Sequence, residues 1–232
     1  MTSQPTEPNA LKSLYRDKKE LFGLVYEFNM LPAGYIHRTW IESIIPYPLF
    51  QKLINSKRGL EKLSRLILER NQLIDEFHYD FLDPSLRLAL LPRKVIEKLI
   101  LYCGIALNHV NITAAIGRIK QKEIIECIGR KGYLFAAKEA PLLVGNREIL
   151  KGAWPAQLDV GGFIESCGAA YLLSSLAHAP RPLFIRLMLK LPKHVSQKQQ
   201  LVQLKQKANQ RWLLLRRILM HAIEVQWYPL FS

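Results

Sequence analysis

Cysteine is scarce in this sequence, and its pattern argues against two classes of small, cross-linked protein. The chain has only three cysteines, Cys103, Cys127 and Cys167, and none belongs to a Cys-x-x-Cys pair. An odd number without paired spacing argues against a disulfide framework and against a zinc site. Aliphatic or small residues lie beside each cysteine, so we predict buried, reduced thiols that pack as small apolar side chains.

Long apolar runs are also missing. No stretch approaches the roughly 18 apolar residues that a membrane-spanning helix needs, and Ser166–Ala179, which comes closest, is too short. The polar start at residues 1–9 lacks the basic region and the apolar region of a secretory signal. We therefore expect a cytosolic protein without a transmembrane segment.

The sequence lacks the short motifs of common catalytic sites and phosphate-binding loops. No GxxxxGK[ST], GxSxG or HExxH pattern occurs in it. His37 has no metal-binding partner at ligand spacing, so we interpret it as a structural histidine. The acidic cluster Asp75–Asp83 lacks the turn glycine and the final glutamate of a calcium loop, and we interpret it as a loop anchored by its aromatic residues. We expect no enzyme activity, no metal and no cofactor.

Acidic residues are absent from a long C-terminal segment. Between Ser166 and Ile223 the sequence has ten Lys and Arg residues and no Asp or Glu, and this segment supplies most of the net charge of +14. A field of one sign attracts an anionic partner, such as nucleic acid, a lipid surface or an acidic protein face. A solvated face that keeps the protein soluble is the alternative. The composition alone leaves both open.

Helical periodicity, by contrast, is abundant. Within Leu86–Ile128, apolar residues recur at spacings of three and four, which predicts two adjacent helices with broad apolar faces. We expect Leu99, Cys103, Leu107 and Trp154 to be buried in the core, and Gly129 suits the end of the second helix. The pattern predicts a mainly α fold, a compact multi-helix single domain with at most one or two short strands.

Several later segments extend this helical pattern. Leu142–Val144 could form a short strand, and Leu183–Leu191 fits a strand or a helix, although Pro182 in a first-turn position favours the helix. Small residues around Gly168 form a helix that neighbouring helices can approach closely. Ser196–Gln226 is a long basic amphipathic helix that could dock on its own domain, on another protein's helix or on a membrane surface.

Gly129-Arg130-Lys131-Gly132 has two interpretations. A GxxG loop with basic middle residues resembles the loop of KH domains, where the glycines let the chain approach an RNA backbone closely. A helix C-terminal cap followed by a turn needs the same glycines. A KH unit also needs strands beside its helices, whereas the upstream sequence has helical periodicity. Binding of single-stranded RNA through Gly129–Gly132 is therefore the alternative function.

Five stretches together resemble one known family. They are Phe28-Asn29-x-Leu31-Pro32-Ala33-x-Tyr35-Ile36-His37, Leu88–Pro92, Leu99–His109, Leu142–Gly145 followed by Trp154-Pro155, and Arg186-Leu187-x-Leu189-x-Leu191-Pro192. In this order, from about Phe28 to Pro192, they resemble the YscK/SctK-like accessory proteins of the type III secretion sorting platform.

The resemblance implies a helical, non-enzymatic cytosolic adaptor. Its implied partners are a C-ring-like pod protein and the cytoplasmic domain of the inner-membrane ring protein, with the secretion ATPase and its stator reached indirectly. The implied location is peripheral, at the cytoplasmic face of the inner membrane, and no nucleic acid is expected as a partner.

These observations give a set of predicted segments and sites. We divide the chain into a tail at 1–10, a helical domain at 11–195 and a basic amphipathic helix with its tail at 196–232. The predicted structural motif consists of Leu31, Pro32, Tyr35, His37, Trp154 and Pro155. The predicted partner-binding cations are Arg186, Lys190, Lys205, Arg211, Arg216 and Arg217.

Overall fold

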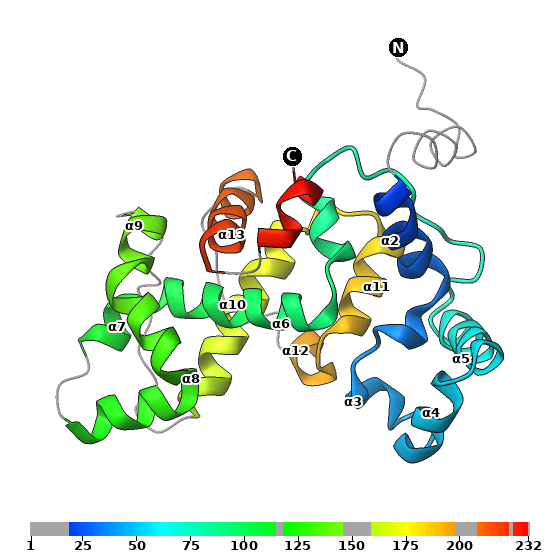
Figure 1. Ribbon diagram of the computed structural model, residues 1–232, viewed down its shortest axis with the longest axis horizontal. Helices are drawn as coiled ribbons and strands as arrows, with labels where there is room; N and C mark the ends of the chain where they lie inside the picture. The colour runs from blue at the N-terminus through cyan, green and yellow to red at the C-terminus, as the bar shows by residue number, and fades with distance from the viewer. Residues whose placement is uncertain (1–18, 115–117, 146–158, 198–207, 223–224, 232) are drawn as a thin grey trace, which may run out of the picture. The chain divides into compact units, whose positions relative to one another are not determined.

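The computed structural model describes residues 19–114, 118–145, 159–197, 208–222 and 225–231 (Figure 1). All regular structure in these ranges is helical and no strand occurs there, which confirms the predicted mainly α fold. The chain forms two compact units, each built from segments that are distant in sequence. The described residues of unit 1 come from 19–93, 179–196 and 229–231, and those of unit 2 come from 94–178, 197 and 208–228.

Unit 1 combines the N-terminal helices with two helices from a later part of the chain. Its elements are α2 (Lys19–Met30), η1 (Pro32–Gly34), α3 (Arg38–Ile41), α4 (Tyr47–Ile54), α5 (Lys57–Arg70), η2 (Leu86–Leu90), α11 (Arg181–Lys190) and α12 (Lys193–Gln197). Its core contains a cluster of buried side chains from several of these elements: Ala33, Ile36, Ile41, Phe50, Leu63, Ile67 and Leu189.

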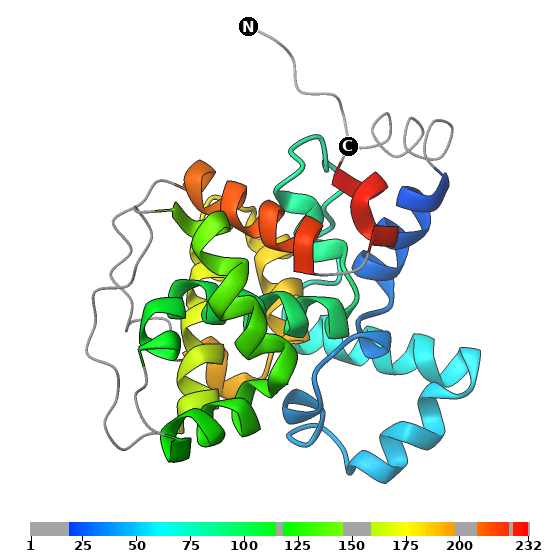
Figure 2. The ribbon, with the colours of Figure 1, turned by 60° about the vertical axis from the view of Figure 1, so that its left-hand side comes forward.

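The α4–α5 pair shows how local sequence sets this packing (Figure 2). Ser56 caps the start of α5, because its hydroxyl accepts a hydrogen bond from the Gly59 amide at 3.1 Å. Gly59 is buried, and a Cβ there would overlap the carbonyl oxygen of Leu53 in α4. Only glycine allows the two backbones to approach this closely.

The segment Leu183–Leu191 is almost entirely helical, as Pro182 in the first turn favoured, because α11 spans Arg181–Lys190. The turn after α11 is fixed to the N-terminal helices. The His37 amide donates to the Leu189 carbonyl at 2.7 Å, and the Trp40 indole donates to the Leu191 carbonyl at 2.9 Å.

Unit 2 is built mainly from longer helices. Its elements are α6 (Arg93–Leu107, whose first residue belongs to unit 1), α7 (His109–Thr113), α8 (Arg118–Lys138), α9 (Ala140–Val144), α10 (Val160–Ser175) and α13 (Ala208–Ala222), and η5 (Val225–Phe231) continues from unit 2 into unit 1.

The predicted helical core is present in unit 2. Leu99 and Cys103 are fully buried and Leu107 is nearly so, which confirms this part of the prediction. Cys127 is exposed, so its predicted burial was wrong. Ile124 and Ile128 mark the buried side of this part of α8, and Cys127 is turned away from that side by the helical period.

Gly129 interrupts α8. It has φ +74° and ψ 159°, a conformation that glycine adopts without steric cost, and the chain continues directly into a second helical stretch. The possible strand at Leu142–Val144 is not formed, because these residues belong to the short helix α9, with Pro141 in its first turn. Within the described residues, the chain offers no partner strand for this segment.

The C-terminal amphipathic helix docks on its own chain. Its main described part, α13, packs against α10 and α9 in unit 2 (Figures 1 and 2). The two ends of the predicted helix belong to other elements, because Ser196 and Gln197 end α12 and Val225 and Gln226 begin η5. Leu215 and Leu219 of the predicted seam are buried, together with Leu214 and Ile218. Residues 198–207 of the predicted helix lie outside the described residues. In the described parts of the chain, no helix is long and apolar enough to cross a membrane.

Two glycines bring α6 and α10 into backbone contact, as the small residues around Gly168 predicted. A Cβ on Gly104 of α6 would overlap the carbonyl oxygen of Ile164, and a Cβ on Gly168 of α10 would overlap the carbonyl oxygen of Ile100. The two contacts are reciprocal, because each helix places a glycine against a carbonyl of the other. The crossing therefore excludes even a methyl group at either position.

We expect Gly104→Ala and Gly168→Ala each to lower the free energy of unfolding by about 1–3 kcal/mol or more, because α6 and α10 must separate to admit the methyl group. Urea denaturation followed by circular dichroism measures the change. Gly23→Ala is the control, because Gly23 lies inside α2 with open space around its Cα. That variant should gain about 0.5–1 kcal/mol from helix propensity. An unchanged denaturation midpoint for Gly104→Ala would contradict the proposed crossing.

Candidate functional site

The predicted N-terminal motif forms a tightly bonded turn in unit 1. Pro32 is buried in η1, and Leu31 before it is half-buried. The Tyr35 hydroxyl donates to the Phe28 carbonyl at 2.6 Å, and the two rings stack with centroids 5.9 Å apart. Burial raises the pKa of Tyr35, so the phenol stays protonated as the donor.

His37 acts as the cap of a short helix. Its Nδ1 accepts a hydrogen bond from the Thr39 amide at the start of α3, at 3.2 Å. Partial burial lowers the pKa of His37, and the positive charge of Arg93 lowers it further. The neutral imidazole that results can accept this hydrogen bond. The side chain therefore has the structural role that its sequence context suggested.

Two cations of α11 point into unit 1. Arg186 is fully buried and donates to the carbonyl oxygens of Asn29, Leu73 and Pro182 at 3.2–3.3 Å. All three acceptors are backbone carbonyls, and that of Leu73 also accepts a hydrogen bond from the Glu76 amide at 3.3 Å. The guanidinium therefore joins α11 to the end of α2 and to the chain after α5.

Lys190, one turn later, is 2% exposed. Its ammonium donates to the carbonyl oxygens of Ala89 and Leu91 at 2.6 and 2.8 Å. It also lies 5.2 Å from the ring centroid of Phe28 and 4.8 Å from that of Tyr35, which adds cation–π attraction. Burial lowers the pKa of Lys190 to about 7, although the carbonyls and rings favour its charged form.

The predicted surface role of Arg186 and Lys190 is therefore wrong. Both cations are buried and bonded to backbone carbonyls, so neither is displayed to a partner. The sequence contains a signal for this, because Arg186 and Lys190 fall on the same three-and-four stripe as the buried Leu183 and Leu187. The helical spacing of these two residues predicts that they face the core, whereas their charge suggested that they face solvent.

The other predicted cations belong to α13 or to the segment before it. Arg216 and Arg217 are exposed on α13, and Arg217 donates to the Leu143 carbonyl at 3.2 Å. Arg211 is half-buried and donates to the Ser174 carbonyl at 2.9 Å. Lys205, like the motif residues Trp154 and Pro155, lies outside the described residues.

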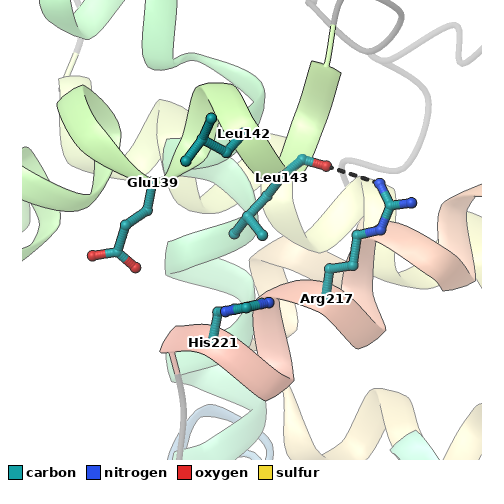
Figure 3. A pocket seen from close by; sticks show the side chains of 5 residues that line it. All are labelled: Glu139, Leu142, Leu143, Arg217 and His221. Atoms are coloured by element: carbon teal, nitrogen blue, oxygen red, sulfur yellow. Dashed lines mark hydrogen bonds between the residues drawn. The ribbon is translucent and has the colours of Figure 1, made fainter.

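A pocket of about 360 Å³ lies beside α13 in unit 2 (Figure 3). Its lining comes from the residue that precedes α9, from α9 and from α13: Glu139, Leu142, Leu143, Arg217 and His221. No local pattern in the sequence indicates this pocket, because it forms only where α9 and α13 pack together.

The other candidate segments have structural explanations. In the Asp75–Asp83 loop, Phe77 and Tyr79 stack with ring centroids 5.9 Å apart and Phe81 is buried. Among the residues that the structure describes, no cluster of His, Cys, Asp or Glu could hold a metal ion. Gly129–Gly132 forms a kink within α8, flanked by helix on both sides. The structure therefore does not support the RNA-binding alternative, because helix and not the strands of a KH unit flanks this segment.

Comparison with known proteins identifies the family of this chain. The sequence matches the family described as "YOP proteins translocation protein K (YscK)" over residues 24–229. The chain belongs to the YscK family. This match extends beyond Pro192 through α13, so the family includes the C-terminal helix that the sequence resemblance did not cover.

A solved structure has the same fold as this YscK family member. It is the cytoplasmic domain of the type III secretion sorting platform protein PscK from P. aeruginosa, with a TM-score of 0.53 and 22% sequence identity. The alignment covers 85% of this chain and 93% of that chain. A search of curated proteins finds no match.

The buried Lys190 should make stability depend on pH. Its pKa is about 7 in the folded protein and about 10.4 in an unfolded chain. Between these values only the unfolded state binds the proton, so the free energy of unfolding should rise with pH by up to about 1.4 kcal/mol per pH unit. Below pH 7 Lys190 is charged in both the folded and the unfolded state, so burial of the charge lowers the free energy of unfolding by its full amount.

Lys190→Met removes the titrating group and serves as the reference. We expect wild-type stability to rise relative to this variant between pH 7 and about 10, as measured by urea denaturation at each pH. Parallel pH profiles for the two proteins would show that Lys190 keeps an ordinary pKa.

Proposed function

We propose that this YscK family member is a non-enzymatic adaptor in the sorting platform of a type III secretion system. It joins a C-ring-like pod protein to the cytoplasmic domain of the inner-membrane ring protein, and through the pod it is linked to the secretion ATPase and its stator. It works in the cytoplasm, at the periphery of the inner membrane. The family match over residues 24–229 carries this proposal.

The distribution of cations supports a protein partner with an acidic face. Arg216 and Arg217 lie exposed on a helix that already packs on its own unit, so these charges remain available while α13 is docked. Exposed charges at the rim of an interface steer association more than they add affinity. We propose Arg216 and Arg217 as partner-binding residues, together with Lys205 and Arg211 from the same basic segment.

The adaptor role predicts a ternary complex. The purified full-length protein should bind the pod protein and the cytoplasmic domain of the ring protein at the same time, because an adaptor needs two separate surfaces. Size-exclusion chromatography with light scattering measures the mass of the complex. Binding of only one partner, or displacement of one by the other, would contradict the adaptor role.

Charge reversal on α13 should slow association. We expect Arg216→Glu to lower the association rate for an acidic partner by roughly two- to tenfold at low salt and to flatten the salt dependence, because steering is electrostatic. Stopped-flow mixing at several ionic strengths measures both effects.

Arg130→Glu is the matched control for this charge reversal, because Arg130 is exposed on α8 of the same unit and has the same charge. Circular dichroism checks that both variants fold. Equal salt slopes for Arg216→Glu and Arg130→Glu would assign the α13 cations to a solvated surface.

A further inference from the structure

The structure contains a pocket whose shape and charge suit one kind of protein segment. We propose that the α9–α13 pocket of unit 2 binds an acidic amphipathic segment of a partner protein, with a bulky apolar side chain in the pocket and a carboxylate facing α13. This inference rests on the proposed adaptor function, because it identifies where an adaptor surface lies and what chemistry the partner brings.

The apolar part of the site comes from two neighbouring leucines of α9. Leu143 is buried at the pocket, whereas Leu142 is 82% exposed beside it. A single exposed leucine is ordinary on a protein surface. Here the exposed leucine borders a cavity of about 360 Å³, which is at the lower end of the roughly 300–1,000 Å³ range of ligand-binding pockets. A segment that fills the cavity would also cover Leu142.

The charged part of the site comes from one face of α13. Arg217 and His221 are four residues apart, which places them one helical turn apart along the pocket (Figure 3). The bond from Arg217 to the Leu143 carbonyl fixes the guanidinium beside the cavity. A guanidinium has five N–H donors, so the same side chain can also bind a carboxylate of the partner.

Charge complementarity therefore indicates an acidic occupant. Arg217 and the neighbouring Arg216 are positive, and the sequence from Ser166 to Ile223 has no acidic residue that would neutralise them from within the same segment. Glu139 is the acidic side chain of the lining, and it comes from the other side of the pocket, between α8 and α9 (Figure 3). It repels an acidic segment and favours the orientation that turns the carboxylate toward α13.

The apolar contact can be tested with a pair of matched leucines. Leu142→Ser should weaken binding by roughly tenfold or more if a partner covers this side chain. Leu82→Ser is the control, because Leu82 is 78% exposed and lies in a loop of unit 1. Both substitutions affect exposed side chains, so both variants should fold. Isothermal titration calorimetry with the pod protein and with the ring protein's cytoplasmic domain gives the dissociation constants.

Two charge variants should act in opposite directions, which general damage to the fold cannot do. Arg217→Glu should weaken binding of the same partner, and Glu139→Lys should strengthen it, each by several-fold and less so at high salt. Arg130→Glu, on α8 of the same unit, should leave the affinity within about twofold.

The outcomes distinguish the site from the adaptor function. Weaker binding for Leu142→Ser and Arg217→Glu with stronger binding for Glu139→Lys, against either partner, supports the inference. Wild-type affinity in all three variants overturns the site while the adaptor function stands. Failure of the wild type to bind either partner overturns both. Loss of self-association in Leu142→Ser, measured by sedimentation, would assign the pocket to a second copy of this chain and also overturn the inference.

Discussion

Unit 1 depends on two cations that a core would normally exclude. Arg186 and Lys190 lie inside it and donate to the carbonyl oxygens of Asn29, Leu73, Ala89 and Leu91. These acceptors lie at the end of α2, in the chain after α5, in η2 and just after η2. A buried charge is costly unless it is well paired, and a buried carbonyl is costly without a donor. The two costs offset each other here, and α11 thereby becomes part of the N-terminal unit.

Local patterns predicted the helices well and predicted burial less well. The period of three and four residues identified the core around Leu99 and Cys103, and Pro182 identified α11 as a helix. The same period also placed Arg186 and Lys190 on the buried stripe, but their charge gave the opposite indication. Only the tertiary structure supplies the carbonyls that make such burial tolerable. For Cys127, the surrounding apolar residues were misleading, because the side of α8 that faces the core is fixed by packing.

The candidate site was harder to predict because its parts are distant in sequence. Leu142 and Arg217 share one pocket, yet each was assigned by its local context, the first to a possible strand and the second to a basic helix. Counting charges in the sequence also overestimates the number of cations that are exposed to a partner. Two of the ten cations between Ser166 and Ile223 are buried in unit 1, and Arg211 is half-buried against the Ser174 carbonyl. Of the three arginines on α13, only Arg216 and Arg217 are exposed.

The order of the segments along the chain has a consequence for synthesis. Lys190 lies 101 and 99 residues after the carbonyls of Ala89 and Leu91 that it bonds. The ribosome therefore synthesises all of residues 94–178, the larger part of unit 2, before it synthesises α11, the helix that completes unit 1. Unit 2 in turn waits for α13, near the end of the chain. Neither unit can reach its final packing until α11 and α13 have been synthesised, and the nascent chain exposes apolar surface until then. A shortened chain that ends before α11 would lack a part of both units.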